Sequence, residues 1–239
     1  MSAPLLQHLA YEWRGRQERI VRIGGSGPAI LFLPPFFEEA NRTRHFLIET
    51  MRGLAARGHD CFLPDLPGTI ESLSPLSDMA WADWTGAVSA VRDRLGTPFH
   101  SATFRGGALL DGSEALSHWR LTPADGRALL RDLVRVRMAA DREDGAVTTA
   151  AAIEEAALSK PFDVAGYTLA PSLLSEMRQA QLTEAPLLRT VRLETDAQPA
   201  SIKIAGQPLW RRSEPGHDPV LSQLVVEDIA DWIASCENG

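Results

Sequence analysis

The sequence has little cysteine, and Cys61 and Cys236 form no CxxC pair or metal-ligand spacing. A disulfide framework and a cysteine-based zinc site are therefore excluded. There is no basic surplus either: the formal net charge is −7, whereas a nucleic-acid-binding surface needs clustered Lys and Arg. No apolar run reaches the roughly 18 residues that a membrane-spanning helix needs. We therefore expect no nucleic-acid partner and no membrane span.

Motifs for cofactors and for export are also lacking. The sequence contains no glycine-rich phosphate loop, zinc-ligand spacing or dinucleotide fingerprint, so we expect no cofactor and no metal. The N-terminal stretch MSAPLLQHLAYEWRG lacks the charged start and long apolar core of a signal peptide. Together with the absence of a spanning segment, this predicts a cytoplasmic protein.

What the 239 residues do contain is an ordinary globular composition, 44% apolar and 23% charged. The apolar runs AILFLPP, HDCFLPDLPG and FHSATFR predict buried strands, and helical patterns separate them over residues 43–58 and 83–96. Pro34 and Pro35 end the first of these strands and predict a loop over residues 36–42. This β-α-β-α-β order is typical of a parallel sheet flanked by helices, with a site at the carboxyl ends of the strands.

The middle of the chain, residues 126–183, has a mainly helical pattern from Gly126 to Gln181, interrupted by a turn in DVAGY (residues 163–167). We expect a helical lid or insertion here, between an N-terminal part of an α/β core over residues 1–125 and a C-terminal part over 184–239. Strand patterns return in LLRTVRLE and PASIKIAG. A final helix follows, with Asp218 as its cap and Pro219 in its first turn.

Several stretches resemble proteins of the α/β-hydrolase fold. FLPDLPGTIES resembles that fold's D-x-P-G-x-G-x-S turn without its second glycine, and EPGHDPVLSQLVVEDIADWI resembles the segment that carries its catalytic histidine. More specifically, LPPFFEEANRTRHF, VRVRMAADRE, DVAGYTLAPSL and GQPLW resemble stretches of the exosortase A system-associated hydrolases of the type called hydrolase 2. The resemblance covers about residues 28–235. It implies an acyl or glycan-linked ester substrate and a partner in exopolysaccharide production or protein sorting.

The turn after the third buried strand lacks the serine that such a hydrolase uses. That fold has G-x-S-x-G here, whereas this chain has TFRGG over residues 103–107. With Gly107 as the last motif glycine, Arg105 takes the nucleophile position; with Gly106, Phe104 does. The family resemblance favours Arg105. Neither side chain can attack a carbonyl, because Arg stays protonated and Phe has no nucleophilic atom.

Three interpretations of Arg105 are open. It could form a structural ion pair with Glu38 or Glu39 of the PPFFEEANRTR stretch, it could bind a carboxylate or phosphate, or it could lie outside the site if the other register holds. Asn41 and Arg42 could line the same mouth or simply start the next helix, with Asn41 as its cap.

His217 and Asp196 are the candidates for catalysis without a serine. His217 lies in the loop where this fold carries its general base, and Asp196 follows the strand that carries the acid partner. Together they could activate a bound water; separately, each could be an ordinary loop residue. Two functions stay open: an ester hydrolase that uses this pair, and a catalytically silent relative that binds an anionic small molecule or a partner protein.

Overall fold

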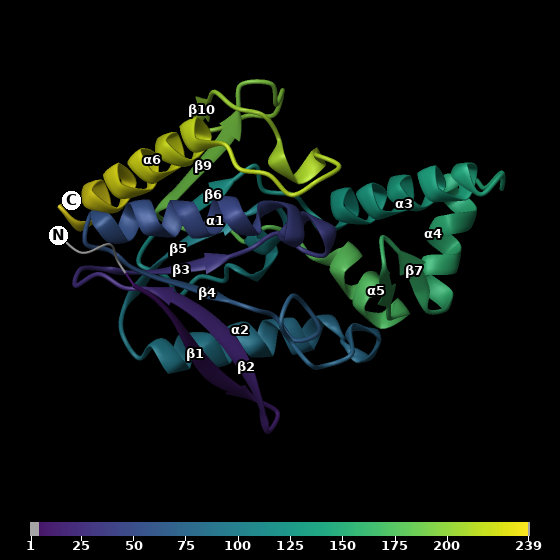
Figure 1. Ribbon diagram of the computed structural model, residues 1–239, viewed down its shortest axis with the longest axis horizontal. Coiled ribbons are helices and arrows are strands. Elements are labelled where there is room, and N and C mark those ends of the chain that lie inside the picture. Colours follow the sequence, from purple (N-terminus) through teal and green to yellow (C-terminus); the bar gives the residue numbers. More distant parts are fainter. Residues whose placement is uncertain (1–4, 239) are drawn as a thin grey trace.

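A mostly parallel sheet forms the centre of the computed structural model, which describes residues 5–238 (Figure 1). The first four residues of the N-terminal stretch considered above lie outside this range. The sheet has eight strands in the order β1-β2-β4-β3-β5-β6-β9-β10. Their bounds are β1 Leu6–Trp13, β2 Arg16–Ile23, β3 Ala29–Leu33, β4 Asp60–Pro64, β5 Phe99–Phe104, β6 His118–Leu121, β9 Leu188–Leu193 and β10 Ile202–Ile204. Pairing is antiparallel for β1–β2 and β2–β4 and parallel for the other neighbours, so the expected fold class is confirmed.

Helices cover both faces of this sheet because its central strands are apolar on both sides. In β3, Ile30 and Phe32 belong to the cluster that packs on α1 (Glu38–Ala56) and α6 (Pro219–Glu237). Leu31 and Leu33 belong to the cluster that packs on α2 (Trp81–Leu95), on the opposite face. Among residues 5–238, no helix has the length and apolar character needed to cross a membrane.

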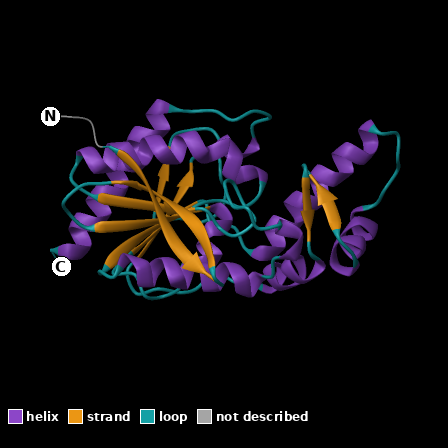
Figure 2. Cartoon of the chain, turned by 60° about the horizontal axis from the view of Figure 1, so that its bottom comes forward, coloured by secondary structure: helices purple, strands orange, loops and turns teal. Residues whose placement is uncertain are grey.

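The chain between β6 and β9 folds beside the sheet rather than into it (Figures 1 and 2). It comprises α3 (Gly126–Glu143), α4 (Ala150–Ser159), a separate hairpin of β7 (Phe162–Val164) and β8 (Tyr167–Leu169), and α5 (Pro171–Gln179). The three helices match the helical pattern of the sequence. The hairpin was not expected, because its strands are only three residues long.

The first helix begins earlier than the sequence predicts. Residues 38–42, expected in a loop, form the first turn of α1, and Phe37 precedes it with a φ of 53° and no side-chain cap. Glu38 and Glu39 favour this start because carboxylates interact well with the positive end of a helix. Asn41 therefore lies inside the helix and is not its cap.

Candidate functional site

The turn after β5 has the sharp geometry of a strand-to-helix elbow, with Arg105 at its tip. Arg105 adopts a φ of 54°, which a residue with a side chain rarely does, whereas Phe104 is extended at φ −128° and ψ 124°. Gly107 lets the turn approach β3, since a Cβ there would lie 2.3 Å from the carbonyl oxygen of Leu33. The turn continues only as a short 3₁₀ helix, η2 (Arg105–Leu110).

The side chain of Arg105 is 9% exposed and is held by two carboxylates. Its Nη2 lies 3.1 Å from Oε1 of Glu39, and its Nε lies 3.2 Å from Oε2 of the same residue. The same Nη2 lies 3.2 Å from Oδ2 of Asp132 on α3, and Nη1 donates to the carbonyl of Thr122 at 3.4 Å. The guanidinium also lies 5.1 Å from the ring centroid of Trp210. The expected ion pair is thus present with Glu39, and Asp132 is an unexpected second partner.

The other residues of the EEAN stretch fasten α1 to its neighbours. Glu38 pairs with Arg42 at 3.5 Å, and Arg42 donates to the carbonyl of Trp210 at 3.2 Å. Asn41 donates through Nδ2 to the hydroxyl of Tyr167 in the β7–β8 hairpin at 2.6 Å. Glu38 and Arg42 line the second cavity described below, and a binding role for the residues of this stretch stays a prediction.

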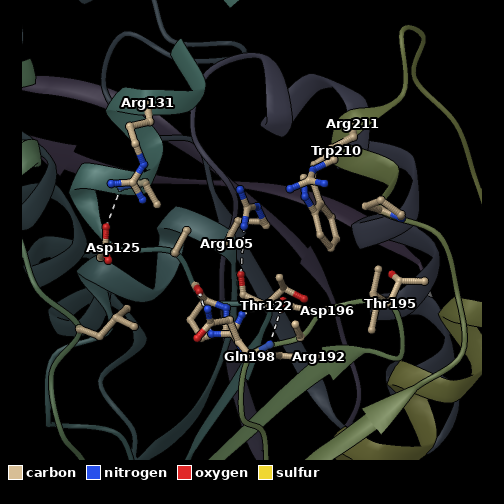
Figure 3. Close-up of a pocket in the computed structure, with 17 residues that line it drawn as sticks. Arg105, Thr122, Asp125, Arg131, Arg192, Thr195, Asp196, Gln198, Trp210 and Arg211 are labelled. Carbon is tan, nitrogen blue, oxygen red and sulfur yellow. Dashed lines mark hydrogen bonds and ion pairs between the residues drawn. The ribbon is translucent and has the colours of Figure 1, made fainter. Parts of the chain in front are cut away.

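Arg105 borders a cavity of about 420 Å³, which we call the arginine cavity (Figure 3). Residues from η2, α3, β9 and the 3₁₀ helix η3 (Leu209–Arg211) line it. Its charged and aromatic lining is Arg105, Arg131, Arg192, Arg211, Asp125, Asp196 and Trp210. Its size lies in the usual range for small-molecule sites, about 300–1,000 Å³.

The charges around the arginine cavity do not balance. Both aspartates are engaged locally: Asp125 accepts from the backbone amide of Ala128 at 2.7 Å, and Asp196 pairs with Arg192 at 2.8 Å. Within residues 5–238, neither Arg131 nor Arg211 makes a side-chain hydrogen bond or ion pair, although both line the cavity. Two guanidinium groups are therefore available to an anionic ligand.

A second cavity of about 340 Å³, the apolar cavity, shares Trp210 and Arg211 with the first. It opens between the start of α1, the middle of α3 and the β7–β8 turn. Its apolar lining is Phe36, Phe37, Leu129, Leu133, Val136, Ala165 and Trp210. The ion pairs of Arg105 with Glu39 and Asp132 form part of the wall between the two cavities.

The structure does not bring His217 and Asp196 together. Asp196 lines the arginine cavity and accepts from the backbone amide of Gln198 at 2.9 Å as well as from Arg192. Burial alone would raise the pKa of Asp196. These two hydrogen bonds outweigh that effect, together with the charges of Arg192 and Lys203, so the pKa of Asp196 lies below its ordinary value. His217 stacks on His45, with 4.6 Å between ring centroids, and its buried Nδ1 has no hydrogen-bond partner in the described part of the chain. Their catalytic roles stay predictions.

Three residues of this site were missed by the sequence reasoning. Asp132 and Arg131 belong to a stretch in which charged residues alternate with apolar ones at helical spacing, a pattern typical of a solvated helix face. Arg211 gave no signal beyond standing next to Trp210. Arginines outnumber acidic residues around residue 131, which is a sign of a basic surface. That excess does not indicate which side of the helix faces a cavity.

Comparisons with known proteins agree with the fold. No family model matches the chain, and no curated protein does. Among solved structures, Est1E of Butyrivibrio proteoclasticus with bound ferulic acid has a TM-score of 0.63 at 12% identity, covering 95% of this chain and 99% of that one. Mouse α/β hydrolase domain-containing protein 10 has a TM-score of 0.60 at 14% identity, covering 97% of this chain and 99% of that one. An epoxide hydrolase variant of Vigna radiata has a TM-score of 0.58 at 13% identity, covering 96% of this chain and 99% of that one. The chain thus has an α/β-hydrolase fold, and this likeness establishes the fold alone.

Proposed function

We propose that this protein binds a small organic anion beside its elbow and does not hydrolyse esters by nucleophilic attack. The observation that carries the proposal is the arginine cavity. A buried, paired arginine stands at the elbow tip, and two further arginines without acidic partners face the space beside it.

The chemistry of the elbow argues against acyl transfer. A serine hydrolase needs a nucleophile at this tip and hydrogen-bond donors for the oxyanion that forms. Here the tip carries a guanidinium, and the nearest group from α1 is the Glu39 carboxylate, which would repel an oxyanion. The 3₁₀ helix that follows is six residues long, so it offers little helix dipole.

The same residues favour anion binding. Arginine pairs with carboxylate and phosphate through two parallel hydrogen bonds, and such charge-assisted bonds are about twice as strong as neutral ones. Arg131 and Arg211 come from α3 and η3, on different sides of the cavity, so one anion could be held between them (Figure 3). Trp210 supplies an apolar wall beside this position.

The biological setting we propose follows from the sequence resemblance to exosortase-associated hydrolases. In that setting the ligand, or a partner protein, belongs to exopolysaccharide production or protein sorting. The test is a deletion strain complemented either with the native gene or with a gene encoding Arg131→Gln/Arg211→Gln. Exopolysaccharide output that is unchanged by the deletion would contradict the association.

A second candidate function is hydrolysis with His217 and Asp196 on a bound water. It is favoured by the position of Asp196 in the arginine cavity and by its lowered pKa, which keeps it ionised. It requires the His217 loop to move away from His45 toward that cavity. Turnover that depends on His217 distinguishes this candidate from anion binding alone.

Calorimetric titration with ethyl phosphate tests the anion site. We expect saturable binding by the native protein. Arg131→Gln/Arg211→Gln should bind at least about tenfold more weakly, because hydrogen bonds to charged groups contribute about 1.5–3 kcal/mol each. Arg142→Gln, an exposed arginine on the same helix, is the matched control and should bind like the native protein. Equal affinity in the double variant and the native protein would contradict the proposal.

A further inference from the structure

We infer that the anion carries a linear apolar chain, with its head in the arginine cavity and its chain in the apolar cavity. This inference rests on the proposed anion site and names the class of ligand: an alkyl carboxylate or alkyl phosphate. It is carried by the contrast between two adjoining cavities, one with free cationic groups and one lined by apolar side chains.

The apolar cavity is built to accept hydrocarbon. Phe36, Phe37, Leu129 and Leu133 on its wall are all at most 9% exposed, so they are held in place by the core behind them. Val136, in the next turn of α3, is 40% exposed and lies at the open side of the same cavity. Covering this surface with an alkyl chain removes apolar area from water, at about 25 cal/mol per Å².

Apart from Arg211, which also lines the arginine cavity, the charged groups around the apolar cavity are paired with one another or with Arg105. Glu38 pairs with Arg42, while Glu39 and Asp132 both pair with Arg105. Arg135 also contacts Asp132. A polar ligand would therefore compete with existing ion pairs and leave its own hydroxyls against aromatic rings, which is costly.

Trp210 and Arg211 give the ligand a continuous path. Both residues line both cavities, so a chain that leaves the head group between Arg131 and Arg211 can pass over the indole toward Val136. Away from Arg211, the arginines that line the apolar cavity are already paired with Glu38 and Asp132, so a second negative charge at the far end of the chain would find no free cation there. The site therefore favours ligands that are charged at one end only.

The test is a chain-length series of alkyl phosphates, from ethyl to octyl, and a parallel series of alkanoates, all below their micellar concentrations. We expect affinity to rise up to about fourfold per added methylene until the cavity is filled, because burying a CH₂ contributes about 0.8 kcal/mol. A rise in either series supports the inference and identifies the preferred head group. Octanol should bind far more weakly than octyl phosphate, because it lacks the charge.

The substitution Val136→Gln tests binding of the alkyl chain separately from binding of the anionic head group, and it adds no charge. We expect Val136→Gln to weaken the binding of octyl phosphate by about tenfold and to leave the binding of ethyl phosphate unchanged. The reason is that a polar side chain removes apolar contact at the open side of the apolar cavity. Val147→Gln is the control, because Val147 is 99% exposed and lies outside both cavities.

The two proposals fail in different ways. If ethyl and octyl phosphate bind equally and Arg131→Gln/Arg211→Gln weakens both, the anion site stands and the apolar-chain inference is overturned. If octyl phosphate binds with an affinity that the arginine substitutions do not change, the anion site is contradicted. If nothing in either series binds, both fall.

Discussion

At the scale of single residues, the informative feature is an arginine in a backbone conformation that costs free energy. Arg105 is held at positive φ, and its guanidinium is oriented by Glu39, Asp132 and the carbonyl of Thr122. These contacts offset the strain and the cost of burying the charge. The elbow thus presents a fixed cation at its tip.

The first prediction concerns this ion pair. Replacement Arg105→Met should lower the free energy of unfolding by about 2 kcal/mol, because it leaves Glu39 without its partner and removes one of the two arginine partners of Asp132. Urea unfolding of Arg105→Met, Glu39→Gln and the double variant measures the coupling between them. The double variant should be less destabilised than the sum of the single changes. Strict additivity would show that the pair contributes nothing beyond its separate residues.

At the scale of elements, local patterns predicted most of the order of strands and helices. Apolar runs identified β3, β4 and β5, and the Asp218-Pro219 start of α6 is confirmed, with Asp218 accepting from the amide of Leu221 at 3.0 Å. The predicted start of α1 was wrong, because the two prolines and two aromatic residues that precede the helix predict a loop. What moves the boundary to Glu38 is the positive φ of Phe37, which short-range patterns do not reveal.

The site was predictable only where the family resemblance or the elbow motif pointed to it. An ion pair of Arg105 with Glu38 or Glu39 was one of the interpretations left open, and the structure shows the pair with Glu39. Asp132 lies 27 residues from Arg105 in sequence and reaches it only because α3 folds back over the elbow. That packing depends on the whole α3–α5 segment, so no periodicity in the sequence could have identified the pair.

The second prediction concerns the approach of η2 to β3. A methyl group at Gly107 would lie 2.3 Å from the carbonyl oxygen of Leu33 and 2.5 Å from that of Pro34. Gly107→Ala should therefore destabilise the fold by about 3 kcal/mol, because backbone atoms must shift. Gly86→Ala in α2 is the contrast: its nearest contact would be an ordinary 3.5 Å to Trp13, and alanine stabilises helix interiors by up to about 1 kcal/mol. Thermal unfolding of the two variants should shift in opposite directions.

At the scale of the whole molecule, positive charge is concentrated in one place although the chain as a whole is negative. The chain carries a net charge of −7, yet it places four arginines around one cavity beside the elbow. A second buried cation, Arg120, lies on β6 and is paired with Asp111 at 2.8 Å. Asp111 also lies 3.0 Å from Nδ1 of His118, and all three side chains are at most 2% exposed. Buried charge thus connects η2 to the sheet.

The third prediction is the effect of pH on this buried cluster. Burial acts to raise the pKa of Asp111, but the hydrogen bond and charge of His118 and the charge of Arg120 lower it below its ordinary value. A carboxyl whose folded pKa is depressed stabilises the fold above its unfolded pKa, about 3.9, and this contribution is lost as the pH falls through the folded pKa. Stability should therefore decline below about pH 4.

Asp111→Asn tests the origin of that decline. We expect it to cost about 3–5 kcal/mol near neutral pH, because it leaves Arg120 without its buried counter-charge. It should also flatten the loss of stability at acid pH, as measured by urea unfolding across a pH series. A variant with native stability and a native acid transition would show that the cluster does not contribute.

The central claim, that a fixed charge has replaced nucleophilic catalysis at this elbow, is tested most directly by an ester assay. The native protein, Arg105→Ala and His217→Ala are incubated with chromogenic short- and medium-chain esters and thioesters. We predict that none of the three gives turnover above the buffer rate, because no nucleophile stands at the tip and His217 lies away from Asp196. Turnover by the native protein that His217→Ala abolishes would contradict the claim and establish a serine-independent hydrolase.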